Sequence, residues 1–185
     1  MKPWSRDGDE VVTELEQHES GLLRGLVSQI NDMLMARAEE APQDELSELT
    51  GIRTGPATAP DDPILSRLLP DFHRLDADQP SKEDMDSAAA LRSLHEPTLL
   101  DMKTGVAAIV LDTCPRDGGP VRLSLEQADA WLSALNDVRL ALGTALDVDD
   151  DMPDELPDDD PRAGHLPVYH WLTVMQEELI HAMST

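Results

Sequence analysis

The chain has 185 residues, of which 38 are acidic and 14 are Lys or Arg, so its formal net charge is -24 at pH 7. A protein that grips nucleic acid through the phosphate backbone needs clustered Lys and Arg, which displace counterions. This sequence has no such cluster, so its charge argues against direct DNA or RNA binding and against an anionic membrane surface. A partner protein with a basic surface would be attracted. The alternative is that the charge only keeps the chain soluble.

The composition is that of a globular protein whose core is built from aliphatic side chains. Apolar residues make up 40% of the chain and aromatic residues 3%, which suits helices that pack on helices. The length fits a single domain over residues 1–185. No apolar run approaches the roughly 20 residues that span a bilayer, and MKPWSRDGDE lacks the apolar stretch of a signal peptide. We therefore expect a cytoplasmic protein.

The N-terminal part is predicted to contain a short strand followed by a long helix. Residues 10–15 alternate between polar and apolar side chains, as in a strand. The next apolar residues recur at intervals of three and four and predict a helix from Glu16 to Glu40; they are Leu22, Leu26, Ile30, Met33 and Leu34. Residues 41–80 are rich in Pro, Gly, Thr and Asp and read as a long connector with short helical turns. Pro63 suits the first turn of one such helix, and Pro70 ends it.

A second long helical region follows the connector. Ser81, three residues before Asp84, forms a variant of the capping box that starts helices. Pro97 lacks a backbone donor, so the stretch after it is either a second helix or a kinked continuation of the first. Residues 106–111 are apolar nearly all round, which predicts that this stretch is the central and most buried element.

The C-terminal half is predicted to contain a strand, two helices and an acidic loop. Residues 121–125 alternate like a strand and follow the turn at 117–120. Because Leu-Glu-Gln follows both this strand and the strand at 10–15, the two are expected to pair as an antiparallel ribbon. The fold class is therefore mainly α, a single bundle-like domain with a small two-stranded ribbon. Residues 147–165 are predicted to form a mobile acidic loop between the two helices.

The sequence supports none of the common kinds of catalytic or metal site. Glu178 and His181 have the Glu-x-x-His spacing of di-iron bundles, but such a centre needs that motif twice and two further glutamates. The acidic run from Asp147 lacks the glycine and glutamate that a calcium loop requires. No nucleophile turn and no phosphate-binding glycine signature occurs. We expect no catalytic residue, no metal and no cofactor; a metal-dependent helical-bundle enzyme stays as an alternative.

Cys114, the one cysteine of the chain, is the candidate redox residue. It cannot form a disulfide within this chain, and a Cys-based zinc cluster is excluded. It is predicted to lie at a helix C-terminus near Asp112 and Asp117. The negative helix end and the carboxylates should raise the pKa of its thiol and disfavour the reactive thiolate. A half-buried structural cysteine is therefore favoured over a redox sensor.

The stretch WLSALNDVRLALGTAL, residues 131–146, combines an apolar helical face with three polar residues. Trp131, Leu135 and Leu142 are predicted core anchors, together with Trp171 of the last helix. The polar residues Asn136, Asp137 and Arg139 are interpreted as a structural polar joint, with Arg139 inside the apolar arc, Asn136 at its edge and Asp137 on the opposite side. A buried arginine needs a partner, and Asp101 and Glu178 are the predicted candidates.

Several segments resemble the actinobacterial AosR family, the actinomycete-specific oxidative stress regulators, which are domains encoded beside the Clp-protease adaptor. The segments are MKPW, DPILSRLLPDFHR, WLSALNDVRLALGTAL and YHWLTVMQEEL. The resemblance implies a non-enzymatic transcriptional regulator that acts through an alternative sigma factor and responds to oxidants through a disulfide. This chain departs from that pattern because it has only Cys114. The disulfide switch is absent from this chain, or it is an intermolecular disulfide through Cys114, or the protein has another role, for example as an accessory protein of the Clp proteolysis system.

Overall fold

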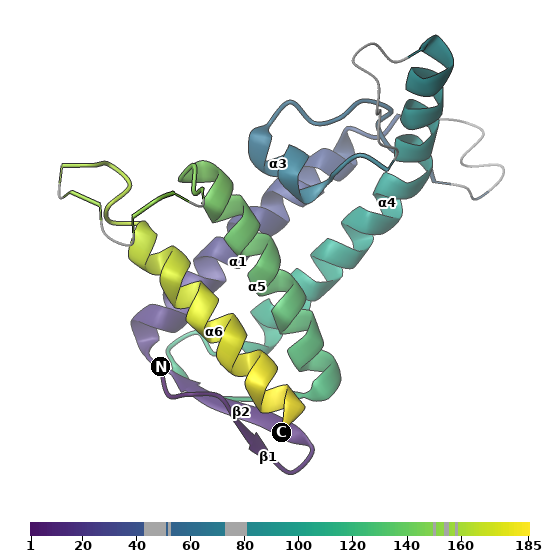
Figure 1. The fold of residues 1–185 in the computed structure, drawn as a ribbon. Helices are drawn as coiled ribbons and strands as arrows, with labels where there is room; N and C mark the ends of the chain where they lie inside the picture. Colours follow the sequence, from purple (N-terminus) through teal and green to yellow (C-terminus); the bar gives the residue numbers. More distant parts are fainter. Residues whose placement is uncertain (43–50, 52, 73–80, 150, 154–155, 158) are drawn as a thin grey trace.

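The protein is a helical bundle that is closed at one end by a small sheet (Figure 1). The computed structural model describes residues 1–42, 51, 53–72, 81–149, 151–153, 156–157 and 159–185. Its elements in chain order are β1 (Ser5–Asp7), β2 (Glu10–Leu15), α1 (Gln17–Glu39), α3 (Pro63–Leu68), α4 (Lys82–Thr113), β3 (Gly119–Ser124), α5 (Leu125–Ala145) and α6 (Leu166–Ser184). The mainly helical fold class predicted from the sequence is confirmed.

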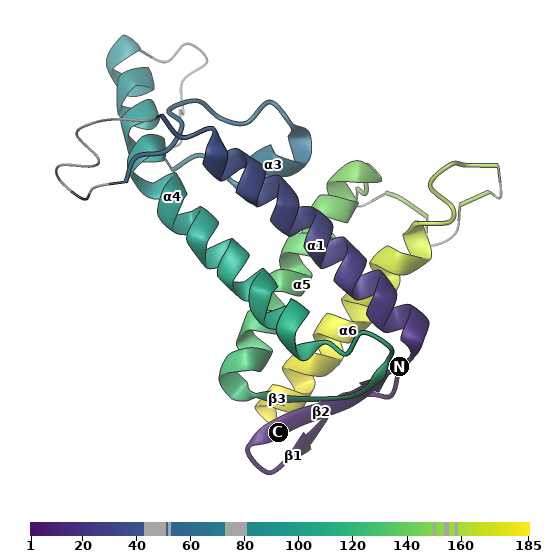
Figure 2. The same ribbon diagram turned by 180° about the vertical axis from the view of Figure 1, so that it is seen from behind.

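The helices form two layers. Figure 1 shows α5 and α6 in front of α1 and α4, and Figure 2 shows the same layers from behind. The short helix α3 packs on α5, and the sheet lies below the helices. Both chain ends lie at the sheet end of the molecule. None of the described helices is long and apolar enough to cross a membrane.

The sheet has three antiparallel strands in the order β1-β2-β3. The predicted ribbon is its β2–β3 half, in which Val11 pairs with Leu123 and both side chains are buried. The prediction of two strands was wrong by one, because β1 is only three residues long and too short for an alternation to be read from it. Arg122 of β3 crosses β2 and pairs with both Asp7 and Glu10, which fastens the outer strand.

Capping side chains start α4 and α5, and the first of these starts lies where the Ser81 signature predicted it. The hydroxyl of Ser81 accepts from the backbone of Asp84, whose carboxylate accepts from the backbone of Ser81. Ser124 and Gln127 form the same reciprocal pair at the start of α5. Each pair satisfies backbone donors that a helix start otherwise leaves free. The strand β3 therefore passes into α5 without a loop.

Helix α4 continues through Pro97 as a single helix. A proline at this position has no N–H for the carbonyl four residues earlier, that of Ser93. Here the backbone N–H of Gly55 donates to that carbonyl at 2.7 Å, and the Ser93 hydroxyl donates to the carbonyl of Gly55 at 2.9 Å. The connector thus satisfies the group that the proline leaves free, and residue 55 is fixed against α4.

Helix α5, rather than the end of α4, is the central element. It contacts α1, α3, α4, α6 and two strands, and its Trp131 and Leu135 are fully buried. The prediction that residues 106–111 are the most buried was wrong: within this stretch Ala107 and Val110 are buried, while Ala108 is exposed. Only one face of α4 meets α1 and α5, so the apolar residues on its other face stay partly in water.

The predicted acidic loop joins α5 to α6, and its described residues contain neither helix nor strand. Residues 150, 154–155 and 158 of this loop lie outside the described residues, as do 43–50, 52 and 73–80 of the connector. At the start of the loop, Asp147 has a φ of 52° and leads the chain away from α5. Near its end Arg162 pairs with Asp160 and donates to the carbonyl of Leu146, which holds the two ends of the loop together.

Candidate functional site

The three polar residues of α5 occupy different environments. Asp137 is buried and accepts from the ammonium of Lys103 on α4 at 2.5 Å. Burial raises the pKa of the Asp137 carboxyl, and the hydrogen bond and charge of Lys103 oppose that rise. The expectation that Asp137 points away from the core was therefore wrong. Asn136 is exposed, and its side chain makes no hydrogen bond to the residues that the structure describes.

Arg139 lies between α5 and α6, half-buried, and has no carboxylate partner among the described residues. Its Nε donates to the hydroxyl of Thr173 at 3.1 Å, and its Nη1 donates to Oε1 of Gln176 at 2.7 Å. The guanidinium carbon lies 5.4 Å from the ring centroid of Tyr169. The predicted partners were wrong: Asp101 pairs with Arg53, and no hydrogen bond or ion pair joins Arg139 to Glu178. The charge of Arg139 is thus held in place by neutral groups.

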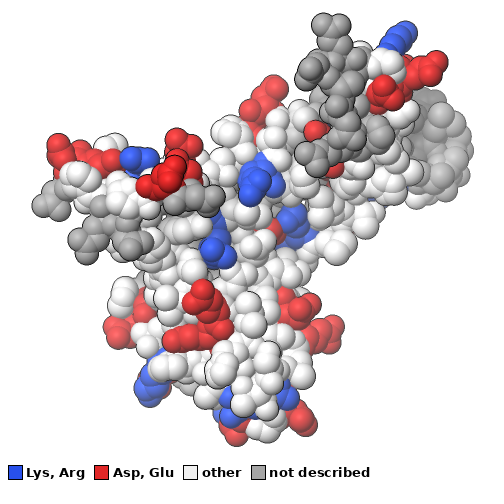
Figure 3. Space-filling view, in the orientation of Figure 1, with Lys and Arg blue, Asp and Glu red and all other residues white. Residues whose placement is uncertain are grey.

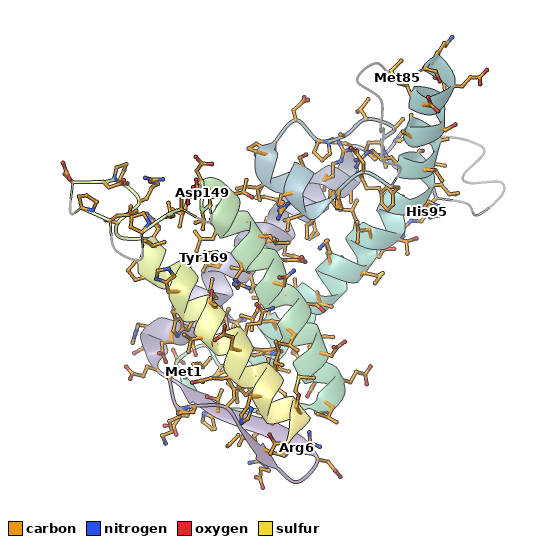
Figure 4. All side chains as sticks on the ribbon, in the orientation of Figure 1. Met1, Arg6, Met85, His95, Asp149 and Tyr169 are labelled. Atoms are coloured by element: carbon orange, nitrogen blue, oxygen red, sulfur yellow. The ribbon has the colours of Figure 1, made fainter. Side chains whose placement is uncertain are left out.

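A cavity of about 350 Å³ opens beside Arg139, where α3, α5 and α6 meet. It is lined by Arg67, Arg139, Leu140, Gly143, Thr144, Asp147, Val148 and Tyr169. Figure 3 shows Lys and Arg side chains in the middle of this face, as well as near the sheet end, while Asp and Glu lie mainly toward the acidic loop, the far end of α4 and the sheet end. In Figure 4, Tyr169 projects from the first turns of α6 beside the upper part of α5. The cavity therefore has a more basic lining than the chain as a whole.

A second group of charges is buried between α1 and α4. Glu96 is fully buried and accepts from Arg37 at 2.7 Å through one oxygen and from Arg92 at 2.5 Å through the other. Arg92 also pairs with Asp71, and Arg37 pairs with Glu40 and donates to the carbonyl of Thr58. Sequence reasoning missed this group, which we call the Glu96 cluster. Its five charged side chains join α1 and α4 to the connector, which is a structural role.

Cys114 caps the C-terminus of α4 and is buried, with 2% of its surface exposed. Burial raises the pKa of its thiol, and Ser20 and Arg24 oppose that rise. The direction agrees with the sequence-based expectation, but the main cause is burial rather than neighbouring carboxylates. Arg24 donates to the carbonyls of Leu111 and Cys114, so an arginine neutralises the negative end of the helix.

Glu178 and His181 do not form part of a metal centre with other described residues, because no group of three or more His, Cys, Asp and Glu side chains converges there. His181 is exposed, whereas Oε2 of Glu178 is buried without a hydrogen-bond partner among the described residues.

The two remaining predicted core anchors are less buried than Trp131 and Leu135. Leu142 and Trp171 are only partly buried and pack against the edge of the core. Trp131 itself donates through Nε1 to Thr113 and meets the ring of Trp4 edge-on at 5.6 Å.

Comparison with known proteins supplies the family. Over residues 1–183 the chain matches a family model described as a domain of unknown function (DUF2017). Proteins named "Oxidative stress regulator AosR" from Mycobacterium bovis and Mycobacterium tuberculosis are 46% identical to it, over 95% of this chain and 83% of theirs. A "Putative oxidative stress regulator AosR" from Mycobacterium leprae is 41% identical, over 99% of this chain and 88% of its own. No solved structure gives a significant match. The chain belongs to the DUF2017 family, and the mycobacterial AosR proteins are its relatives.

Proposed function

We propose that this protein is a non-enzymatic, cytoplasmic regulator of transcription in the oxidative-stress response and that it acts by binding another protein. The proposal that it regulates this response is carried by its 46% identity, over nearly its whole length, to proteins named oxidative stress regulators. The charge of -24 supports a protein partner rather than DNA, because most of the surface of this acidic protein would repel the DNA phosphates.

The proposed partner has a basic surface, as a region of an alternative sigma factor would have. The docking face that we propose is formed by the outer sides of α6 and the start of α5, which lie side by side where Gln176 reaches the carbonyl of Leu132. Asp129 and Glu177 supply exposed acidic groups there. Its exposed apolar side chains are Leu125, Val174 and Ile180. Acidic groups around apolar side chains match a basic amphipathic helix in charge and hydrophobicity.

The proposed regulation does not depend on oxidation of Cys114. Its thiol is buried and its pKa is raised, so the thiolate that reacts with peroxide is disfavoured. An intermolecular disulfide through Cys114 would also require the end of α4 to open. In this member of the family, we therefore propose that the partner protein senses the oxidant or that oxidant stress changes the amount of the regulator in the cell.

Crosslinking of the full chain in its own cells, before and after peroxide, tests the proposal. We expect a transcription factor with a basic surface, of the sigma-factor type, among the crosslinked proteins, and its crosslinks should map to α5 and α6. A partner set made only of proteolysis components would favour an accessory role in Clp proteolysis instead. A nanomolar complex of the purified protein with DNA at physiological salt would overturn the charge argument.

A pair of charge-reversal variants shows whether the contact is local. Changing Asp129→Lys together with Glu177→Lys should weaken partner binding at least about tenfold, because both charges lie in the proposed face. Changing Asp61→Lys together with Asp86→Lys alters the net charge by the same amount at exposed positions elsewhere, one in the connector before α3 and one on α4. This control should change the affinity by less than about twofold. Equal losses in the two variants would mean that only the net charge matters.

A further inference from the structure

The cavity between α3, α5 and α6 is lined by two arginines whose charges no described carboxylate neutralises by pairing. Arg67 projects from α3 as an exposed residue, and its guanidinium makes no hydrogen bond or ion pair with the described residues. Among the described residues, the Arg139 side chain is hydrogen-bonded only to Thr173 and Gln176, and it lies over Tyr169. In a chain with 38 acidic and 14 basic residues, two cations that face one cavity without ion pairs are unexpected. We infer that this cavity binds a small molecule through its carboxylate or phosphate group.

Arg139 is held in a conformation that suits such a ligand. Its Nε and Nη1 are used on α6, while its Nη2 donates to no described residue. A guanidinium carries five N–H donors in a rigid plane, and the free ones match the oxygens of a carboxylate or phosphate. Because Thr173, Gln176 and Tyr169 already fix the side chain, little conformational entropy is lost when the ligand binds.

The size and remaining lining of the cavity restrict the ligand to a small molecule. About 350 Å³ is near the lower end of the volumes of small-molecule sites. Leu140, Val148 and the ring of Tyr169 offer an apolar wall, and a methyl group in place of the Gly143 hydrogen would come within 3.3 Å of that ring. The ligand should therefore carry a compact apolar part beside its acidic group. A nucleic acid is disfavoured because the rest of the surface is acidic.

Asp147 lines the same cavity and provides an internal test of the ligand's charge. Its carboxylate repels a bound anion but would attract a bound amine. Asn tolerates a positive φ as Asp does, so Asp147→Asn keeps the backbone at its φ of 52°. The variant should bind an anion several-fold more tightly, because one repulsive charge is removed at short range.

Titration of the full chain with sodium benzoate, phenyl phosphate and inorganic phosphate, followed by amide NMR at constant low ionic strength, tests the inference. We expect saturable shifts at Gly143, Thr144 and Tyr169 with at least one probe; the benzoate and phosphate arms distinguish the two acidic groups. Arg67→Gln should weaken that binding about tenfold, since one charge-assisted hydrogen bond is lost. Arg116→Gln removes the same charge at an exposed site outside the cavity and should change it less than about twofold.

Three outcomes would overturn the inference: no saturable shift with any of the three probes, equal weakening by Arg67→Gln and Arg116→Gln, or weaker binding by Asp147→Asn. The inference does not rest on the proposed regulatory role. Loss of partner crosslinking by the α5–α6 charge reversal and loss of anion binding by Arg67→Gln are separate measurements on separate surfaces, so either proposal can fail while the other holds.

Discussion

Arg37 on α1 and Glu96 on α4 form a buried ion pair at 2.7 Å, and Glu96 is fully screened from water. The two residues are 59 positions apart in the chain. Glu96 also precedes Pro97, the residue whose missing N–H lets the connector bond to α4. One short stretch of α4 therefore fixes both α1 and the segment after it, and the arrangement depends on a single carboxylate shared by two arginines.

Replacing Glu96 by alanine is expected to destabilise the fold strongly. The change leaves Arg37 and Arg92 buried without their shared anion, and breaking a buried pair costs about 3–5 kcal/mol. Urea unfolding followed by circular dichroism measures the free energy of unfolding. Asp86→Asn, at an exposed position of the same helix, should change that free energy by less than about 0.5 kcal/mol. A loss below about 1 kcal/mol for Glu96→Ala would contradict the role given to the Glu96 cluster.

Lys103→Met is expected to destabilise the protein in a pH-dependent way. Burial already raises the folded-state pKa of Asp137 above its unfolded value, so ionised Asp137 costs stability above that folded pKa. Lys103 opposes this rise in the pKa of Asp137, so removing it increases the loss of stability that ionised Asp137 causes. At neutral pH the variant should lose about 3 kcal/mol. As the pH falls toward the ordinary pKa of aspartate, Asp137 is protonated in both states and the difference should shrink.

Unfolding curves of wild type and Lys103→Met at several pH values between neutral and acid check this. The control is Lys82→Met, which removes an exposed lysine from the same helix. Its difference from wild type should stay small at every pH. A Lys103→Met difference that grows as the pH falls would show that the sign of the Asp137 shift is wrong.

The elements of this fold were predictable where local chemistry determines them. The helix start at Ser81 was predicted because its capping pair depends on residues only three apart. Ser124 and Gln127 have the same spacing, but no cap was predicted there. The pairing of β2 with β3 followed from alternation and from the repeated Leu-Glu-Gln. The strand β1 was missed because three residues contain too little pattern. The burial of Asp137 was missed because a helical wheel shows one face, whereas α5 is covered on several sides.

The Glu96 cluster could not be predicted for a different reason. In the sequence, Arg37, Arg92 and Glu96 look like ordinary surface charges, and their meeting depends on how α1 and α4 cross. The cavity beside Arg139 could not be predicted for the same reason, because its lining depends on how three helices pack: Arg67 reaches it from α3 and Tyr169 from α6. An available signal was that Arg139 lies inside an apolar arc and has no Asp or Glu three or four positions away on the helix; that signal located an unusual arginine but not its neighbours.

The thiol of Cys114 is expected to react slowly in the folded protein. It is buried with a raised pKa, so both access and thiolate formation are limited. Iodoacetamide labelling at pH 8 should be at least about tenfold slower in the folded than in the urea-unfolded protein. Peroxide should produce no disulfide-linked dimer on a non-reducing gel. Rapid labelling of the folded protein together with peroxide-induced dimers would restore Cys114 as a redox switch and contradict the proposal that regulation does not depend on oxidation of Cys114.

Gly118→Ala is expected to destabilise the turn that leads from α4 into β3. Gly118 has a φ of 78°, and an added Cβ would lie 2.6 Å from the backbone nitrogen of Gln17. The left-handed conformation and the clash with backbone atoms act together, so we expect a loss of at least about 2 kcal/mol in the free energy of unfolding. Gly105→Ala is the matched control, because Gly105 lies within α4 with open space around its Cα. That variant should gain about 0.5–1 kcal/mol from its better helix propensity. If the two alanine variants had equal stability, the contact between the 118 turn and the start of α1 would not be a determinant of the fold.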